Sequence, residues 1–277
     1  MAFFLKCLKL KSVATVVGLF LIVSSQGNAL VLDWNNVAWN SGDLTNSYDV
    51  DGDSVNDITI TVSPDFTTNS PPTGAFTNLS SSGQFSPVRD AVFTGGGGAN
   101  NQNLYLGVDF GNRNQLITVT VAFTQTVTDV SFTLFDVDFN FGQFRDIISL
   151  ASATDGITNF TGNFTTGTSH QVAPFNLGGQ PFVFGNGGSA NTSSAGNLGI
   201  DFGTDQINSF SFNYSSTPTF IGDGGTPTNP GVQGIGLHDI NFTVVPEVEG
   251  FVAVALMCGL IFGNMLRRRL LMRDDAF

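Results

Sequence analysis

Apolar and polar residues alternate in short runs through the middle of the chain, which is typical of β-strands with one buried face. In residues 116–123, Ile117, Val119 and Val121 fall on one face, and Thr118 and Thr120 fall on the other. The runs that predict strands in this way are 58–62, 104–110, 116–123, 130–134, 146–150, 182–184, 198–202, 207–214 and 237–244.

Clusters of Gly, Asn, Ser and Pro separate these runs, notably at 95–103, 185–196 and 222–231. The chain has 27 phenylalanines but only two glutamates, Glu247 and Glu249, so strand and turn formers dominate over helix formers. We therefore predict an all-β protein with a single antiparallel β-sandwich or jelly roll over residues 30–244. The absence of a repeating unit of propeller length disfavours a propeller.

The first 29 residues have the three parts of a signal peptide. Lys6, Lys9 and Lys11 precede an apolar run at 13–23, and Gly27-Asn28-Ala29 offers a small-x-small cleavage site. The apolar run is too short for a comfortable membrane crossing. We predict export, with cleavage after Ala29.

A second apolar segment, residues 250–266, lies near the end of the chain. At 1.5 Å per residue it would reach roughly 25 Å, enough for a thin bilayer. The cluster Arg267, Arg268 and Arg269 follows it and would act as a stop-transfer signal that keeps residues 267–277 in the cytoplasm. The alternative is a buried core helix, which the terminal position and the arginines disfavour. The pattern predicts a single C-terminal transmembrane helix.

The C-terminal segment, residues 245–277, resembles the PEP-CTERM sorting signal of bacterial exosortase substrates. Val245-Pro246-Glu247 matches the short motif within 245–249, and the helix and the arginine cluster follow in the family's order. Val248 stands where the family has its second proline. The resemblance implies sorting to the cell envelope and processing by an exosortase. Without processing, the chain would remain anchored by its helix.

Charge and cysteine content narrow the function classes. Between residues 30 and 249 the chain holds only Arg89, Arg113 and Arg145 against 20 of its 22 acidic residues, the other two being Asp274 and Asp275. So acidic a surface repels phosphate backbones, which excludes nucleic acid as a partner. Both cysteines of the chain lie in the apolar end segments, so the predicted domain has neither disulfides nor thiolate metal sites.

One motif indicates metal binding. Carboxylates at positions 1, 3, 5 and 9 of a tight loop, with a carbonyl at position 7, can wrap a calcium ion. Ser54 at position 6 and Ile60 at position 12 exclude an EF-hand, and the loop resembles the calcium loops of FG-GAP-type extracellular β repeats. The alternative is a solvated acidic turn. The predicted calcium ligands are Asp49, Asp51, Asp53, Val55 and Asp57.

A second acidic group carries two open interpretations. Asp136 and Asp138 lie two residues apart at the end of a predicted strand, followed by Arg145-Asp146. They form either a weaker calcium site at the sandwich edge or turn caps that pair with Arg145. Asp239 could add a ligand, but a plain surface position is the favoured interpretation.

No catalytic motif is present, because His170 and His238, the only histidines, stand in no recognisable triad or metal pattern. A glycoside hydrolase with paired aspartates stays open as a minor alternative. We predict a non-catalytic exported envelope or matrix protein with calcium-stabilised loops. The alternative is a carbohydrate-binding module, which would need exposed aromatic residues. The candidates for such a platform are Trp34, Trp39, Tyr48, Tyr105 and Tyr214. The two tryptophans would otherwise lie in the core under the first strand.

Overall fold

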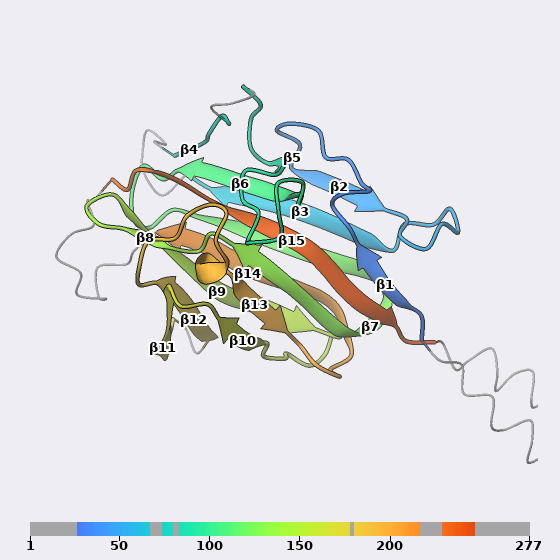
Figure 1. Cartoon of the computed structure of the whole chain (residues 1–277). Helices are drawn as coiled ribbons and strands as arrows, with labels where there is room; N and C mark the ends of the chain where they lie inside the picture. Colours follow the sequence, from blue (N-terminus) through green and yellow to red (C-terminus); the bar gives the residue numbers. More distant parts are fainter. Residues whose placement is uncertain (1–26, 67–73, 80–82, 178–179, 217–228, 247–277) are drawn as a thin grey trace, which may run out of the picture. The chain divides into compact units, whose positions relative to one another are not determined.

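The computed structural model of the chain describes residues 27–66, 74–79, 83–177, 180–216 and 229–246 (Figure 1). The contacts divide the chain into two compact units, and the described residues lie almost entirely in the unit Asn28–Val245. Within the described ranges this unit is all-β, and its one helix is the single 3-10 turn η1 (Ser194–Gly196). The predicted fold class, an all-β sandwich, is confirmed.

All strand pairs are antiparallel, and the strands form two layers joined through the long strand β7 (Leu116–Phe135). The first layer contains, in spatial order, β2 (Thr45–Tyr48), β3 (Ile58–Asp65), β7, β14 (Ile207–Ser216), β9 (Phe144–Thr154), β12 (Gln180–Gly185) and β11 (His170–Leu177), with β8 (Phe139–Asn140) paired to β9. The second contains β6 (Asn103–Asp109), β15 (Val232–Val244), β7, β13 (Leu198–Asp201) and β10 (Asn163–Thr166), flanked by β1 (Ala29–Leu32) on β15 and by β4 (Ala75–Phe76) and β5 (Val88–Asp90) on β6.

Strand β7 belongs to both layers. Its first half pairs with β3 and β14, as in Val121↔Ile60, and its second half pairs with β13 and β15. The two predicted runs 116–123 and 130–134 are therefore one strand, because the chain stays extended while it crosses between the layers. Asp129 lies within this crossing at a φ of 55°.

The core fills the space between the layers with aliphatic and aromatic side chains. Phe132 of β7 stacks on Phe210 of β14, with ring centroids 4.8 Å apart. Phe123 packs against Phe242 of β15 at 5.0 Å. Burial of this apolar surface stabilises the folded state by about 25 cal/mol per Å². A domain of this size can therefore be stable without a disulfide.

Every predicted run corresponds to a strand, although several strands extend beyond it. The prediction missed strands such as β2, whose sequence Thr-Asn-Ser-Tyr has a single buried side chain, that of Tyr48. Such strands pair at the edges of the layers, where little apolar surface is buried. Their formation depends on a neighbouring strand rather than on their own pattern.

The predicted end segments lie mostly outside the described residues, including residues 1–26, the helix 250–266, Glu247 and the arginine cluster. The described part of the chain has no helix with the length and hydrophobicity that a membrane crossing requires. Asn28, Ala29 and Val245 belong to the folded unit. Ala29 of β1 pairs with Thr243 of β15, and the Val245 amide donates to the Thr126 carbonyl at 2.9 Å.

Candidate functional site

The acidic loop, residues 49–57, connects β2 to β3. The register Tyr48↔Ile58 closes the hairpin, and the amide of Asp57 donates to the Tyr48 carbonyl at 2.8 Å. Gly52 and Ser54 adopt positive φ values of 81° and 75°, which allow the chain to turn sharply within the loop.

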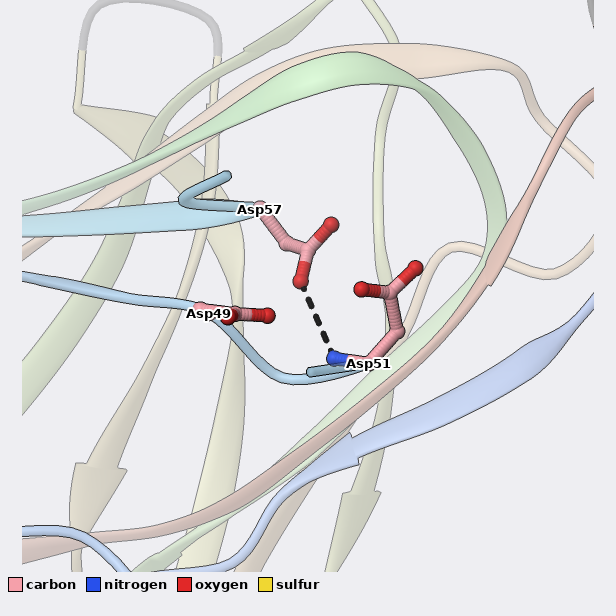
Figure 2. Close-up of side chains that lie close together, drawn as sticks. All are labelled: Asp49, Asp51 and Asp57. Carbon is pink, nitrogen blue, oxygen red and sulfur yellow. Dashed lines mark hydrogen bonds between the residues drawn. The ribbon is translucent and has the colours of Figure 1, made fainter. Parts of the chain in front are cut away.

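Three of the four predicted carboxylates meet at one place in this loop (Figure 2). One oxygen from each of Asp49, Asp51 and Asp57 lies within 4.8 Å of the others. Asp49 and Asp51 are exposed, and Asp57 is half-buried. Asp53 is not a member of this group; its Oδ1 accepts from the amide of Val55 at 2.7 Å. Three oxygen ligands that reach solvent fit a hard cation such as calcium.

Backbone amides hold these carboxylates in place. Oδ2 of Asp57 accepts from the amides of Val50 at 2.7 Å and Asp51 at 3.2 Å, the second of which is drawn in Figure 2. Asp49 accepts from Gly52 through Oδ1 at 2.7 Å and from Ser54 through Oδ2 at 2.8 Å. Because each carboxylate has about four lone-pair sites over its two oxygens, these bonds leave acceptor capacity for a cation on both side chains. The loop is therefore shaped before any ion binds.

The second acidic group is not a cluster of the same kind. Within the described ranges, only the Asp49 group brings three ligand oxygens together. Oδ2 of Asp138 accepts from the amide of Ser189 at 2.8 Å, and Oδ2 of Asp146 accepts from the amide of Asp138 at 3.1 Å. Arg145 lies over the rings of Phe139 and Phe184. These bonds give Asp138 and Asp146 partners in the backbone, and pairing of the aspartates with Arg145 stays a prediction.

Burial has strong effects on the titration of this second group. Asp146 is fully buried, and desolvation raises its pKa well above the ordinary value. Desolvation, assisted by the negative charge of Asp138, raises the pKa of Asp136 to about 7. Desolvation also raises the pKa of Asp138. The interior of this region therefore favours protonated carboxyls.

A polar groove of about 420 Å³ lies on the outer face of the second layer. It runs over β10, β13, β7 and β15, and its floor includes backbone next to the buried side chains of Phe132 and Ile200. The polar residues that line the groove, besides His238, are Ser131, Thr133, Thr165, Asp201, Asp239 and Asn241, and Gly199 lines it as well.

Strand register explains why these residues meet. Gly199 of β13 pairs with Thr165 of β10 on one side and Thr133 of β7 on the other, so the three positions form one row across the strands. Because Gly199 has no side chain, the middle of this row is hollow. The neighbouring row brings Asp201 and Asn241 to either side of β7, since both pair with Ser131.

The rim of the groove at β15 is shaped by a register shift. Pairing with β7 is interrupted between Leu237 and Ile240, which turns His238 and Asp239 toward the groove. Oδ1 of Asp239 accepts from the amide of Trp34 at 2.9 Å, and Oδ2 lies 3.7 Å from Nε2 of His238. The side chain of Asp239 is 21% exposed and bonded to the Trp34 amide, a contact that the interpretation as a plain surface residue did not include.

His238 is itself held from two sides. Its Nε2 lies 2.8 Å from Oδ1 of Asn101, and its ring centroid is 4.6 Å from that of Phe135. Desolvation lowers the pKa of His238 and raises that of Asp239, so burial disfavours charge on both. Asn101 and Trp34, which hold His238 and Asp239, are far away in sequence. No local motif could therefore indicate these contacts.

The aromatic candidates for a sugar platform are all buried. Trp34 is fully buried, with its ring 6.2 Å from Trp39 and 6.1 Å from Tyr48 in edge-on contacts. Tyr105 and Tyr214 are 8% and 0% exposed. The core interpretation of the two tryptophans is confirmed, the three tyrosines are buried as well, and none of the five forms an exposed platform.

No protein-family model and no curated protein matches the chain. Among solved structures it is similar to the C-terminal domain of a chitobiase from Bacteroides fragilis, at 14% identity and a TM-score of 0.24, over 47% of this chain and 66% of that chain. It is also similar to the family 11 carbohydrate-binding module from Clostridium thermocellum in complex with a β-1,3-1,4-mixed-linked tetrasaccharide. That match has 13% identity and a TM-score of 0.29, over 81% and 99% of the two chains.

A further match is the family 11 module of a cellulosomal cellulase from Clostridium thermocellum. It shares 12% identity with a TM-score of 0.30, and the match covers 80% of this chain and 98% of that chain.

Proposed function

We propose that this chain is an exported, non-catalytic protein of the cell envelope or extracellular matrix that binds carbohydrate in its polar groove. The groove is the observation that carries the proposal. Its volume of about 420 Å³ falls within the usual range for small-ligand sites. Its hydroxyl, amide and carboxylate groups offer both donors and acceptors, which is the chemistry that sugar hydroxyls require.

The absence of an exposed tryptophan or tyrosine shifts the burden of recognition to hydrogen bonds. Ordered polar groups bind best when the protein already holds them in place, because less conformational entropy is then lost. Asp201 accepts from the amide of Gly203 at 2.7 Å, and Asp239 accepts from that of Trp34. Both carboxylates are therefore oriented before a ligand arrives.

The binding test uses the full chain, solubilised in a detergent without a sugar headgroup and run through native gels that contain dissolved polysaccharides. Retardation in at least one polysaccharide relative to a plain gel supports carbohydrate binding. Equal mobility in every gel would overturn it and leave a structural role in the envelope. Because glycoside hydrolases use a pair of carboxylates, Asp201 and Asp239 make glycoside hydrolysis the second candidate function. Release of reducing ends from a polysaccharide that retards the protein would establish this activity.

Calcium at the acidic loop is a structural part of the same proposal. The gathered oxygens of Asp49, Asp51 and Asp57 support it, because three nearby negative charges repel one another without a cation. The ion would join the start of the loop to its end, next to β3. Its chemistry here is stabilising, since an ion that binds only the folded state shifts the folding equilibrium.

Export and sorting rest on the two end segments of the sequence. The signal peptide would direct the chain out of the cytoplasm, and residues 245–277 would sort or anchor it, with an exosortase as the processing partner. Because Val245 is bonded to Thr126, a truncation should begin at residue 247 to leave the folded unit intact. Release of the truncated protein from the membrane fraction supports the anchor, and the mass of the mature full-length protein reports both processing events.

A further inference from the structure

We propose that the polar groove selects uncharged sugar residues and excludes acidic polysaccharides, with Gly199 as the floor on which the sugar ring lies. The inference rests on the proposed carbohydrate-binding function and adds the ligand class and the position of the ring. Three observations carry it: the charge of the groove, the orientation of its carboxylates, and the missing side chain at its centre.

Apart from His238, the ionisable side chains that line the groove are both acidic. Two carboxylates line it, and no lysine or arginine is among its lining residues. Arg89 is close in the fold, but it donates Nη1 to the carbonyl of Val37 at 2.8 Å and does not line the groove. A uronate, sulfate or phosphate group would enter without a cationic partner, which electrostatic repulsion and desolvation oppose. An uncharged hydroxyl-rich ligand meets no such cost.

The carboxylates of Asp201 and Asp239 can accept hydrogen bonds from the hydroxyl groups of a ligand. Oδ1 of Asp239 is occupied by the Trp34 amide, and Oδ1 of Asp201 is occupied by the Gly203 amide. Each carboxylate has acceptor capacity beyond these bonds, so a sugar hydroxyl that enters the groove can donate to it. Oδ2 of Asp239 also lies 3.7 Å from Nε2 of His238. Thr133, which is half-buried, can donate or accept beside them.

The centre of the groove exists because residue 199 is glycine. A Cβ at this position would lie 3.4 Å from Cβ of Thr165, which is ordinary contact, so the backbone alone does not demand glycine. The backbone there is regular strand and pairs with both neighbours. A larger side chain would project into the hollow between Thr165 and Thr133. Glycine therefore leaves room for a ligand without serving a turn.

This geometry makes Gly199→Val the decisive variant. Valine suits a β-strand, so the substitution fills the groove without opposing the fold. Ser63→Val places the same side chain at an exposed position of β3, outside the groove, and is the matched control. Asn241→Ala removes one exposed amide from the groove and keeps the test open if Gly199→Val does not fold.

The experiment measures the dissociation constant of each full-length protein by affinity electrophoresis. The probes are the uncharged polysaccharides galactomannan, xyloglucan and mixed-linked β-glucan, and the acidic polysaccharides alginate and polygalacturonate. We expect wild type and Ser63→Val to bind an uncharged probe with equal dissociation constants and to show no binding to the acidic probes. Gly199→Val should weaken binding by about tenfold or more, and Asn241→Ala should weaken it by a smaller factor.

The outcomes separate the two levels of the proposal. If wild type binds a polysaccharide and the groove variants bind it equally well, the groove assignment is overturned while the carbohydrate function stands. If acidic polysaccharides bind at least as tightly as uncharged ones, the selectivity is overturned. If wild type binds none of the probes, the carbohydrate function itself fails, and the inference fails with it.

Discussion

The phenol of Tyr214 donates a 2.9 Å hydrogen bond to Oδ1 of Asp146, and both side chains are fully buried. The bond joins β14 to the start of β9 inside the sandwich. Burial raises the pKa of both groups, so neither favours its charged form there. A polar contact in this position is valuable because it gives the buried phenol hydroxyl an acceptor and gives Oδ1 of Asp146 a donor, while Oδ2 is bonded to the Asp138 amide.

Tyr214→Phe should therefore lower the free energy of unfolding by about 1–3 kcal/mol, because it leaves a buried carboxyl oxygen without its donor. Chemical denaturation followed by tryptophan fluorescence measures this loss. Tyr48→Phe is the control: its hydroxyl donates to the Ala38 carbonyl at a partly buried site, where water can replace it. Equal losses in the two variants would contradict the special role of the Tyr214–Asp146 bond.

The prediction of the fold from sequence succeeded where one face of a strand is buried. Ile117, Val119 and Val121 alternate with polar residues because they pack against the opposite layer. A short stretch of the sequence is enough to show this alternation. Strand β10, in contrast, reads Asn-Phe-Thr-Thr and has no buried side chain. It forms because β13 offers a partner edge, and that edge is a property of the whole fold.

The two candidate sites also differ in whether their residues are close together in the sequence. The acidic loop is local in sequence, and three of its four carboxylates lie close together, with Asp53 outside the group. The groove combines β10, β13, β7 and β15, and Asp239 is held by Trp34 across 205 residues. Such a site depends on strand register and on a register shift, neither of which a linear motif encodes.

The second prediction concerns pH and Asp136. Burial and the charge of Asp138 raise the Asp136 pKa from 3.8 to about 7, so the folded state keeps a proton that the unfolded chain releases. The contribution of Asp136 to stability is thus fully present below its unfolded pKa and is lost as the pH rises toward 7. We expect the free energy of unfolding, measured with a chelator present, to fall between pH 4 and pH 7.

Asp136→Asn removes this proton release and should flatten the pH dependence. Asparagine tolerates the left-handed backbone at this position, where φ is 60°, so the substitution adds little strain. At pH 8 the variant should be more stable than wild type by about 1 kcal/mol or more. An unchanged slope in Asp136→Asn would assign the pH dependence to Asp138 and Asp146, whose pKa values are also raised.

The third prediction separates the members of the acidic loop. Millimolar calcium should raise the melting temperature of wild type, because extracellular calcium sites typically bind at about 10⁻⁴–10⁻³ M. Asp51→Asn should abolish most of this rise, since it removes one of the three gathered carboxylates. Asp53→Asn, which lies outside the group, should retain it. A melting temperature that responds to neither calcium nor chelator would show that the loop is a solvated turn.

The last prediction concerns the close packing of Gly185 against the backbone of Asp138. A Cβ on Gly185, at the end of β12, would lie 1.9 Å from the carbonyl oxygen of Asp138, and backbone atoms cannot move aside as a flexible side chain can. Gly185→Ala should therefore lower the free energy of unfolding by about 1–3 kcal/mol or more through overpacking. Gly187→Ala is the control two residues away, because nothing lies within 4 Å of its Cβ position. Denaturation of both variants at the same pH measures the difference, and similar stabilities would mean that the close approach of β12 to Asp138 does not limit this position.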